Sequence, residues 1–380
     1  MPNELIQIVP RLPPAVDGVG EYALHLAEAL GDKHGLISRF VVGDPTWPGV
    51  EVASNPAKAV SARSAKGLLR ALAGGPGRVA MLHYVGYGYS QRGVPSWLVR
   101  GLREWVARGN RLTTFFHEIW ASGPPWGSVF WLKPWQKHLT MTVARLSVVG
   151  WTSNLRMARM LGNRFSVVPI SSPLANTIPI RKCQPGPPPW RILIFGLTGP
   201  RLRTVQKFLT LLEYLGDKGL LRQVTLLGNG ASKEPNLSPD AALLEASKVR
   251  GSLRVMGQVD GSAVISAFCE ADFFLSAHPA FLACKSTAIM TAFACGCPVV
   301  LPDGEDAAPL APGQHFLACG NSEKDLAQFG HKGIVECLGA LGRAGRAWYG
   351  ANADWSHTAR IIFETLSTAN GRNSPGGART

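Results

Sequence analysis

The sequence predicts an α/β protein made of two doubly wound domains, each with a parallel β-sheet covered by helices on both faces. Three observations predict this fold class. The chain has 380 residues, more than one hydrophobic core usually fills. Short apolar segments of strand length alternate with segments of helical periodicity. A proline-rich stretch at residues 181–190 interrupts the alternation, which then starts again.

The first half begins with a strand, a loop and a helix. Residues 5–10 are strand-like, residues 11–20 are rich in Pro and Gly, and residues 21–30 have helical periodicity. The same alternation predicts strands at 40–42, 79–84 and 111–116 and helices at 57–72 and 97–108. We expect these elements to form an N-terminal domain over residues 1–180.

Residues 181–190 contain four prolines, which fix φ and remove backbone donors, so this stretch is expected to be a linker. After it, the pattern predicts strands at 192–196, 223–227, 253–256, 272–275 and 298–301 and helices at 205–215, 263–270 and 286–294. We expect a second domain over residues 191–366. The pattern does not decide whether the last helix of this domain crosses back to the first domain. Residues 367–380 are rich in Gly, Asn and Ser and are expected to be a disordered tail.

Composition limits where the protein works. The start of the chain lacks the basic and apolar regions of a signal peptide, and no apolar run has the length of a membrane span. The seven cysteines form no paired zinc-type framework. We therefore expect a cytoplasmic protein, with peripheral contact to the inner face of an anionic membrane as a possibility.

Charge points to anionic partners. The formal net charge is +14, and residues 1–180 hold 19 Lys and Arg against nine Asp and Glu. The remaining residues hold 20 against 16. Such a field attracts phosphorylated small molecules, anionic membranes or nucleic acid. No nucleic-acid-binding signature accompanies the charge, so no nucleic-acid partner is expected.

Gly18, Val19 and Gly20 follow the first strand and open the first helix. Backbone N–H groups at such a position can approach a phosphate, and the helix dipole attracts negative charge. An ordinary strand-to-helix turn is the alternative. The segment lacks the GxGxxG pattern because Val16 and Ala23 stand where glycines would be needed, which disfavours a nicotinamide-dependent oxidoreductase.

Several segments, in the same order, resemble glycosyltransferase family 4 and its retaining GT-B relatives. They are DGVGEYALHLA (17–27), FHE (116–118), FG (195–196), LGNG (227–230), MGQV (256–259), ADFFLS (271–276) and AFACGCPVV (292–300). The resemblance implies the GT-B fold, with two Rossmann-like domains facing across a cleft. It also implies that the C-terminal domain holds a nucleotide-sugar donor and the N-terminal domain holds the acceptor.

Individual residues receive roles from this resemblance and from their positions. His117 follows a strand and is expected to contact the donor sugar, although a lone histidine is often structural. Gly18, His117 and Lys285 form the expected catalytic set. The expected donor-binding set is Gly18, Val19, Gly20, Arg201, Arg203, Gly228, Asn229, Gly257, Gln258, Lys285, Ser286 and Thr287.

Positive charge is expected to replace a metal ion in this site. Arg201 and Arg203 could bind a diphosphate through their guanidinium groups, or they could be solvated loop charges. Lys285 lies just before a helix that Ser286 or Thr287 can cap, and a plain structural cap is its alternative role. No Asp-x-Asp motif is present. We therefore expect no metal and no cofactor, and a UDP- or GDP-sugar as co-substrate.

Aromatic side chains predict the acceptor region. Tyr84 and Tyr87 lie at a strand end, and Trp120 and Trp126 lie beyond the next one. Such rings stack on sugar faces or lie at a lipid headgroup boundary, and inter-element packing is the alternative. With Glu118, they form the expected acceptor set.

Two departures from the family pattern bear on activity. Family members commonly carry two glutamates before the Ala-Cys-Gly-x-Pro segment, and here these positions are Ala283 and Thr291. We expect transfer of a hexosyl unit, with retention and without metal, to a glycan, a lipid-linked glycan or a small molecule. The alternative is a GT-B scaffold or binding protein that has lost catalysis.

Overall fold

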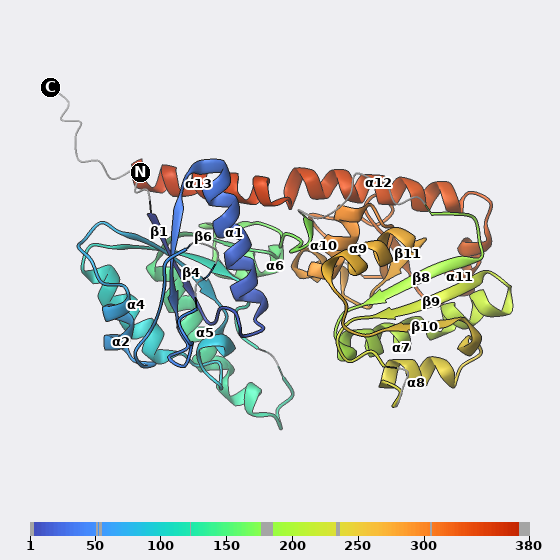
Figure 1. The fold of residues 1–380 in the computed structure, drawn as a ribbon, viewed down its shortest axis with the longest axis horizontal. Helices are drawn as coiled ribbons and strands as arrows, with labels where there is room; N and C mark the ends of the chain where they lie inside the picture. Colours follow the sequence, from blue (N-terminus) through green and yellow to red (C-terminus); the bar gives the residue numbers. More distant parts are fainter. Residues whose placement is uncertain are drawn as a thin grey trace. The chain divides into compact units, whose positions relative to one another are not determined.

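The computed structural model describes residues 4–50, 52, 55–121, 123–175, 185–232, 236–304 and 306–371. The chain forms two compact units (Figure 1). Unit 1 is Met1–Pro169 with Trp355–Thr380, and unit 2 is Ile170–Asp354. The chain thus enters unit 2 before the proline-rich stretch, and its last helix belongs to unit 1.

The described part of unit 1 contains a seven-stranded parallel sheet in the order β3-β2-β1-β4-β5-β6-β7. The strands are β1 (Glu4–Val9), β2 (Ile37–Val42), β3 (Ala57–Ala59), β4 (Val79–Tyr84), β5 (Arg111–Phe116), β6 (Ser147–Thr152) and β7 (Phe165–Val167). Most of their residues are buried, as expected for strands covered on both faces.

Alternate residues of the unit 1 strands face different helices. Ile6 and Ile8 of β1 pack in a cluster with side chains from α2, α4 and α5, whereas Val9 packs with α1. The last helix, α13, lies on α1, where Tyr22 contacts Trp355 and His34 stacks on Phe363. The helices are α1 (Gly18–His34), α2 (Ala65–Ala71), α3 (Gly86–Tyr89), α4 (Ser96–Ala107), α5 (Ser128–Leu146), α6 (Leu155–Leu161) and α13 (Trp355–Gly371).

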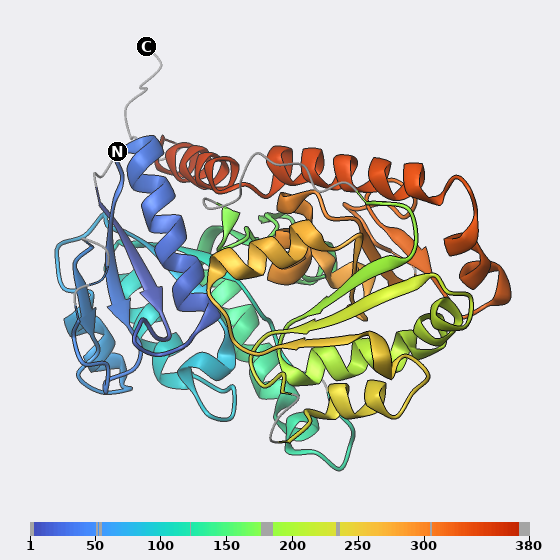
Figure 2. The same ribbon diagram turned by 45° about the vertical axis from the view of Figure 1, so that its right-hand side comes forward.

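The described part of unit 2 contains a six-stranded parallel sheet in the order β10-β9-β8-β11-β12-β13 (Figure 2). The strands are β8 (Trp190–Phe195), β9 (Leu221–Leu227), β10 (Leu253–Met256), β11 (Phe273–Leu275), β12 (Val299–Pro302) and β13 (Leu317–Cys319). Leu193 packs on the side of α9 and α10, and Ile192 and Ile194 pack on the side of α7, α8 and α12. Both faces are therefore covered.

Helices connect the strands of unit 2, and α11 and α12 follow its last strand. The α-helices are α7 (Thr198–Asp217), α8 (Pro239–Glu245), α9 (Gly261–Glu270), α10 (Thr287–Cys295), α11 (Glu323–Ala327) and α12 (Ile334–Asn352). Short 3-10 helices are η2 (Arg250–Ser252), η3 (Ala280–Lys285) and η4 (Gln328–Gly330). The predicted fold class, with two parallel α/β units, is confirmed.

Three local expectations differ from the structure. The helix expected at 57–72 is replaced by strand β3, which pairs with β2, and by α2, which begins after the Ser64 cap. Tertiary pairing overrides the weak helical pattern there. Trp190, expected in the linker, is fully buried as the first residue of β8. The tail expected from residue 367 is helical to Gly371, and its later residues lie outside the described range.

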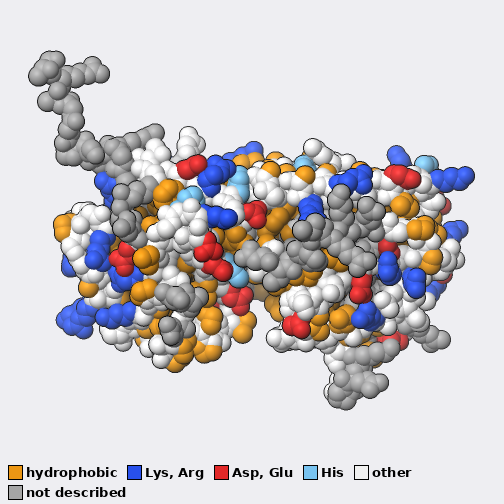
Figure 3. Space-filling view, turned by 45° about the horizontal axis from the view of Figure 1, so that its top comes forward, with side chains coloured by type: hydrophobic (Ala, Val, Ile, Leu, Met, Phe, Trp, Pro, Cys, Tyr) orange, Lys and Arg blue, Asp and Glu red, His pale blue; other side chains and the backbone are white. Residues whose placement is uncertain are grey.

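Within the described residues, no helix is both long and apolar enough to cross a membrane. On the face drawn in Figure 3, Lys and Arg side chains lie over both units, with exposed hydrophobic side chains between them.

Candidate functional site

The strand order gives each unit one place where a ligand is expected. In unit 2, chain connections leave β8 and β11 in opposite directions, and in unit 1 they leave β1 and β4 in opposite directions. In doubly wound sheets, ligands bind outside the carboxyl ends of the strands at this reversal. The loops after β8 and β11, and those after β1 and β4, are therefore the candidate sites.

Three basic side chains gather at the unit 2 reversal. His278, in the loop after β11, is half-buried, and burial is the largest cause of its lowered pKa. The positive charges of Lys285 and Arg203 lower the pKa further, against a backbone hydrogen bond that raises it. Arg203 comes from α7 and Lys285 from the end of η3. We call Arg203, His278 and Lys285 the basic cluster.

Helix α7 begins beside this cluster without a side-chain cap. Its N-cap residue is Leu197, which makes no side-chain cap hydrogen bond and is exposed. The positive end of the dipole of this 20-residue helix therefore has no side-chain acceptor from the N-cap residue, and Pro200 in the first turn carries no N–H. The Ala277 N–H donates to Thr204 Oγ1 at 3.0 Å, which ties the end of β11 to α7.

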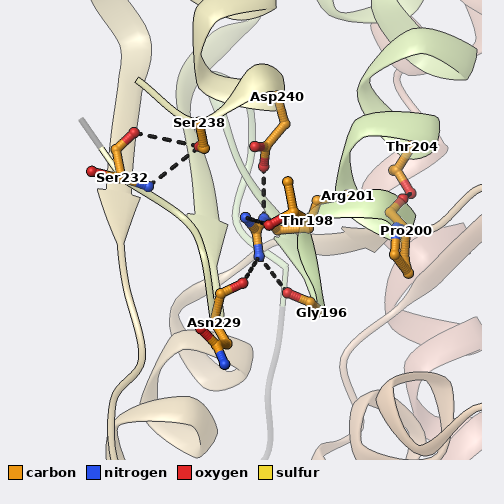
Figure 4. A network of polar contacts seen from close by, with 9 residues as sticks. All are labelled: Gly196, Thr198, Pro200, Arg201, Thr204, Asn229, Ser232, Ser238 and Asp240. Carbon is orange, nitrogen blue, oxygen red and sulfur yellow. Dashed lines mark hydrogen bonds and ion pairs between the residues drawn. The ribbon is translucent and has the colours of Figure 1, made fainter. Parts of the chain in front are cut away.

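Arg201 has a structural position, not the direct ligand contact that was expected. Its side chain and that of Asp240 are both fully buried, and Nε donates to Asp240 Oδ2 at 2.6 Å. Nη1 donates to the carbonyl oxygens of Gly196 and Asn229 (Figure 4). These bonds occupy the guanidinium, which links the loops after β8 and β9 from the interior of unit 2.

The glycines after β9 allow those loops to approach each other. A Cβ on Gly228 would overlap the Gly196 carbonyl oxygen, and one on Gly230 would overlap Thr198 Oγ1. Both have positive φ angles. The neighbouring donor-binding candidates, Asn229 and Gln258, are exposed at the carboxyl ends of β9 and β10.

Ser286 caps α10, as the sequence predicted. Its Oγ accepts from the Ile289 N–H at 3.3 Å, and Thr287 is exposed at the first helical position. Ala283 and Thr291, where the resemblance implied glutamates, lie inside the unit. Ala283 is fully buried, and Thr291 Oγ1 lies 2.8 Å from Ser172 Oγ while donating to the Thr287 carbonyl.

The start of α1 differs from the expected phosphate-binding loop. Asp17 is its N-cap, and Asp17 Oδ1 accepts from the N–H groups of Val19 at 2.9 Å and Gly20 at 3.0 Å. These donors are occupied by a carboxylate, which also repels an anion. Gly20 packs tightly against the Arg11 backbone, whereas Gly18 has open space where a Cβ would be. Gly18 thus has free space beside it, whereas Gly20 does not.

His117 lies at the end of a buried polar chain. Gln7 Nε2 donates to Ser38 Oγ at 2.7 Å, so Gln7 Oε1 faces His83 Nε2 at 2.8 Å. A carbonyl oxygen only accepts, so His83 Nε2 carries a hydrogen. Burial lowers the pKa of His83 to about 3, so this ring is neutral and its Nδ1 accepts. His117 Nε2, 3.1 Å away, therefore donates to His83 Nδ1.

The expected acceptor residues separate into buried and exposed ones. Tyr84 is fully buried, and its hydroxyl lies 3.1 Å from Thr140 Oγ1, so direct acceptor contact does not fit its position. Tyr87 is 38% exposed. Glu118 and Trp126 are exposed, and Lys137 Nζ lies 5.6 Å from the centre of the Trp120 ring.

The sequence interpretation treated His83 and His278 as structural residues and did not consider Gln7. Each had a signal: His278 follows a strand at the reversal, and the other two are polar residues inside apolar strands. Among the described side chains, no group of three His, Cys, Asp or Glu residues is arranged to hold a metal ion.

No protein-family model matches the chain, and no curated protein matches it in sequence. Solved structures match it along nearly its full length. Sucrose-phosphate synthase from Thermosynechococcus elongatus has a TM-score of 0.66 at 14% identity, covering 97% of this chain and 100% of that one. The lipopolysaccharide outer core galactosyltransferase WaaB has a TM-score of 0.64 at 10% identity, with 96% and 99% covered.

Anabaena HepE in complex with UDP-glucose has a TM-score of 0.61 at 12% identity, and the match covers 96% of this chain and 99% of that one. At such identities the likeness concerns the fold. The two parallel-sheet units therefore give this chain the GT-B fold of these glycosyltransferase structures.

Proposed function

We propose that this protein is a glycosyltransferase that moves a hexosyl unit from a nucleotide-diphosphate sugar to an acceptor. The basic cluster beside the uncapped start of α7 carries this proposal. Both features lie at the strand-order reversal of unit 2, and both favour a ligand with concentrated negative charge. A sugar diphosphate has that charge, and the GT-B fold supports this class of ligand.

The donor is a UDP- or GDP-sugar. UDP is supported by the solved HepE structure, which contains UDP-glucose on the same fold. In this proposal Lys285 and Arg203 bind the diphosphate oxygens, and His278 donates a hydrogen bond to one of these oxygens. Arg201 acts indirectly by fixing the loops after β8 and β9.

The reaction proceeds with retention and without a metal ion. The bond between the anomeric carbon and the diphosphate oxygen breaks, and the acceptor hydroxyl forms the new bond on the same face of the sugar. The leaving diphosphate takes the acceptor proton. Lys285, Arg203 and the α7 dipole stabilise the charge that develops on the leaving group, the role that a divalent cation has in other transferases.

The acceptor is a glycan, a lipid-linked glycan or a small molecule, bound on unit 1. WaaB, named for the lipopolysaccharide outer core, supports the first two classes. His117, whose Nε2 is held by His83 Nδ1, is the candidate for contact with the donor sugar. Tyr87, Glu118 and Trp126 supply exposed contacts for the acceptor.

A second candidate function is a scaffold that binds a nucleotide sugar without turnover. Ala283 and Thr291 favour it, because neither can ionise and both are buried in the unit 2 interior.

Calorimetry with UDP-, GDP- and ADP-sugars, followed by measurement of nucleotide release with candidate acceptors, separates the two functions. Binding with release supports the transferase, and binding without release supports the scaffold. Absence of binding to every nucleotide sugar would refute both. Release that persists in excess EDTA is expected, and loss of release there would refute the metal-free reaction.

A further inference from the structure

Helix α5 and the loop before it expose large aromatic side chains. Trp126 is 87% exposed, Trp131 71% and Trp135 65%, and Phe130 contacts Trp131 edge to face. So many exposed tryptophans are unusual on a solvent-exposed helix, because each one leaves a large apolar surface in contact with water. Figure 1 shows this segment projecting from the rest of unit 1.

The exposure follows from the helical pattern. Gln136, Thr140 and Val143 recur at helical spacing and are buried against unit 1. Trp131 and Trp135, four residues apart, lie on the opposite side. The buried side of α5 thus makes the packing contacts with unit 1, and the outward aromatic side chains are not needed for this packing. We call Trp126, Phe130, Trp131 and Trp135 the aromatic face.

A basic pocket adjoins the aromatic face. Its volume is about 650 Å³, and its lining includes Trp135 and Leu132 from α5 together with Trp97 from α4. Arg63 and Arg92 also line it, and both are exposed. The pocket therefore combines indole surface with two guanidinium groups, which suit the oxygens of a phosphate.

Gln136 holds the pocket walls in place. Its side chain is buried, and Oε1 accepts from the Ala121 N–H at 3.0 Å. Nε2 donates to the Tyr87 hydroxyl at 3.1 Å and to the Arg92 carbonyl at 3.0 Å. One amide thus joins the loop before α5, helix α3 and the loop after α3. The Arg92 backbone is thereby fixed to the helix that carries the aromatic face.

We infer that this surface docks on an anionic membrane, with the tryptophans of α5 at the headgroup boundary and a lipid phosphate between Arg63 and Arg92. Indoles favour that boundary because they have an apolar body and a polar N–H. Lys133 and Lys137 on the same helix add positive charge, which complements anionic headgroups. The inference does not depend on the proposed function.

Flotation of the full chain with lipid vesicles tests the inference. Wild type should float with vesicles of phosphatidylcholine and phosphatidylglycerol and stay unbound with phosphatidylcholine alone. Arg63→Gln/Arg92→Gln should weaken binding about 30-fold, the factor that corresponds to ~1 kcal/mol for each surface charge. The matched control, Lys218→Gln/Arg222→Gln, removes two exposed charges from unit 2 and should bind as wild type does.

The aromatic face is tested by Trp131→Ser/Trp135→Ser. Because both side chains are exposed, thermal unfolding should be unchanged while flotation is lost. Failure of wild type to float with anionic vesicles would overturn the inference. Equal flotation of wild type and the tryptophan variant would overturn it as well, as would equal loss in the unit 2 control, since that result indicates net charge alone.

Discussion

Replacing Asp240 with alanine tests the internal organisation of the candidate site in unit 2. Asp240 is fully buried and accepts from Arg201 Nε at 2.6 Å. In the variant, the Arg201 guanidinium keeps its bonds to the carbonyl oxygens of Gly196 and Asn229 but loses its counter-charge. A buried cation without an anionic partner is therefore created inside unit 2.

The expected cost is large. Removing one partner of a buried ion pair usually destabilises a protein by ~3–5 kcal/mol, because the remaining charge stays desolvated. For a unit of this size each kcal/mol lowers Tm by roughly 2–4 °C, so a decrease of roughly 6–20 °C is expected. Asp240→Asn keeps an accepting oxygen without the charge and should fall between wild type and Asp240→Ala.

Thermal unfolding followed by circular dichroism measures the global effect, and hydrogen exchange of β8, β9 and their loops measures the local one. Asp217→Ala is the matched control in the same unit. It removes an exposed partner of Lys248, at 3.0 Å, and should leave the melting temperature nearly unchanged. Nucleotide-sugar affinity should also fall in Asp240→Ala, because the loops after β8 and β9 lose their common anchor.

An unchanged melting temperature in Asp240→Ala would refute this reasoning. It would mean that the guanidinium is not desolvated in solution. Arg201 would then be available to a ligand, as the sequence first indicated.

Three further predictions concern single positions. Lys285→Ala should weaken nucleotide-diphosphate binding about 10- to 100-fold in calorimetry, since a hydrogen bond to a charged group contributes ~1.5–3 kcal/mol, and the exposed Lys248→Ala should not. Gly20→Ala should lower stability by ~1–3 kcal/mol because its Cβ would overlap a backbone oxygen of the preceding loop; Gly18→Ala, which has open space, should unfold as wild type does. Burial lowers the pKa of His83 to about 3, below its unfolded value of about 6.5, so the unfolded chain binds the extra proton between these pH values. The stability that this group contributes is present above pH 6.5 and is lost as pH falls. The free energy of unfolding of wild type, measured relative to His83→Asn by urea denaturation, should therefore decrease by about 2 kcal/mol between pH 7 and pH 5.

Some of the candidate site could be predicted from sequence because its residues act locally. Ser286 caps α10 through atoms three residues apart, and the strand ends of β4, β5 and β10 follow from short apolar runs. Such features depend on backbone geometry within a few residues. The resemblance to retaining GT-B enzymes also rests on short segments, and the fold it implied is the fold observed.

The roles of charged residues could not be predicted in this way. Arg201 and Arg203 are two positions apart on α7, yet one is fully buried against Asp240 and the other belongs to the basic cluster. Sequence shows their charge, but helix rotation and the position of α8 decide that Arg201 is buried against Asp240 while Arg203 lies near His278. The Asp17 cap likewise occupies the N–H groups that the glycine pattern offered to a phosphate.

By itself the sequence determined the alternation of strands and helices, the restart after the proline-rich stretch and the surplus of positive charge. Periodicity and composition are enough for these, because they require only that apolar faces be covered. Tertiary structure alone decided that α13 covers α1, that Gln7 and His83 make His117 Nε2 a donor, and that His278 joins Arg203 and Lys285. Each of these depends on contacts between residues far apart in the chain, which sheet order and packing select and local pattern does not.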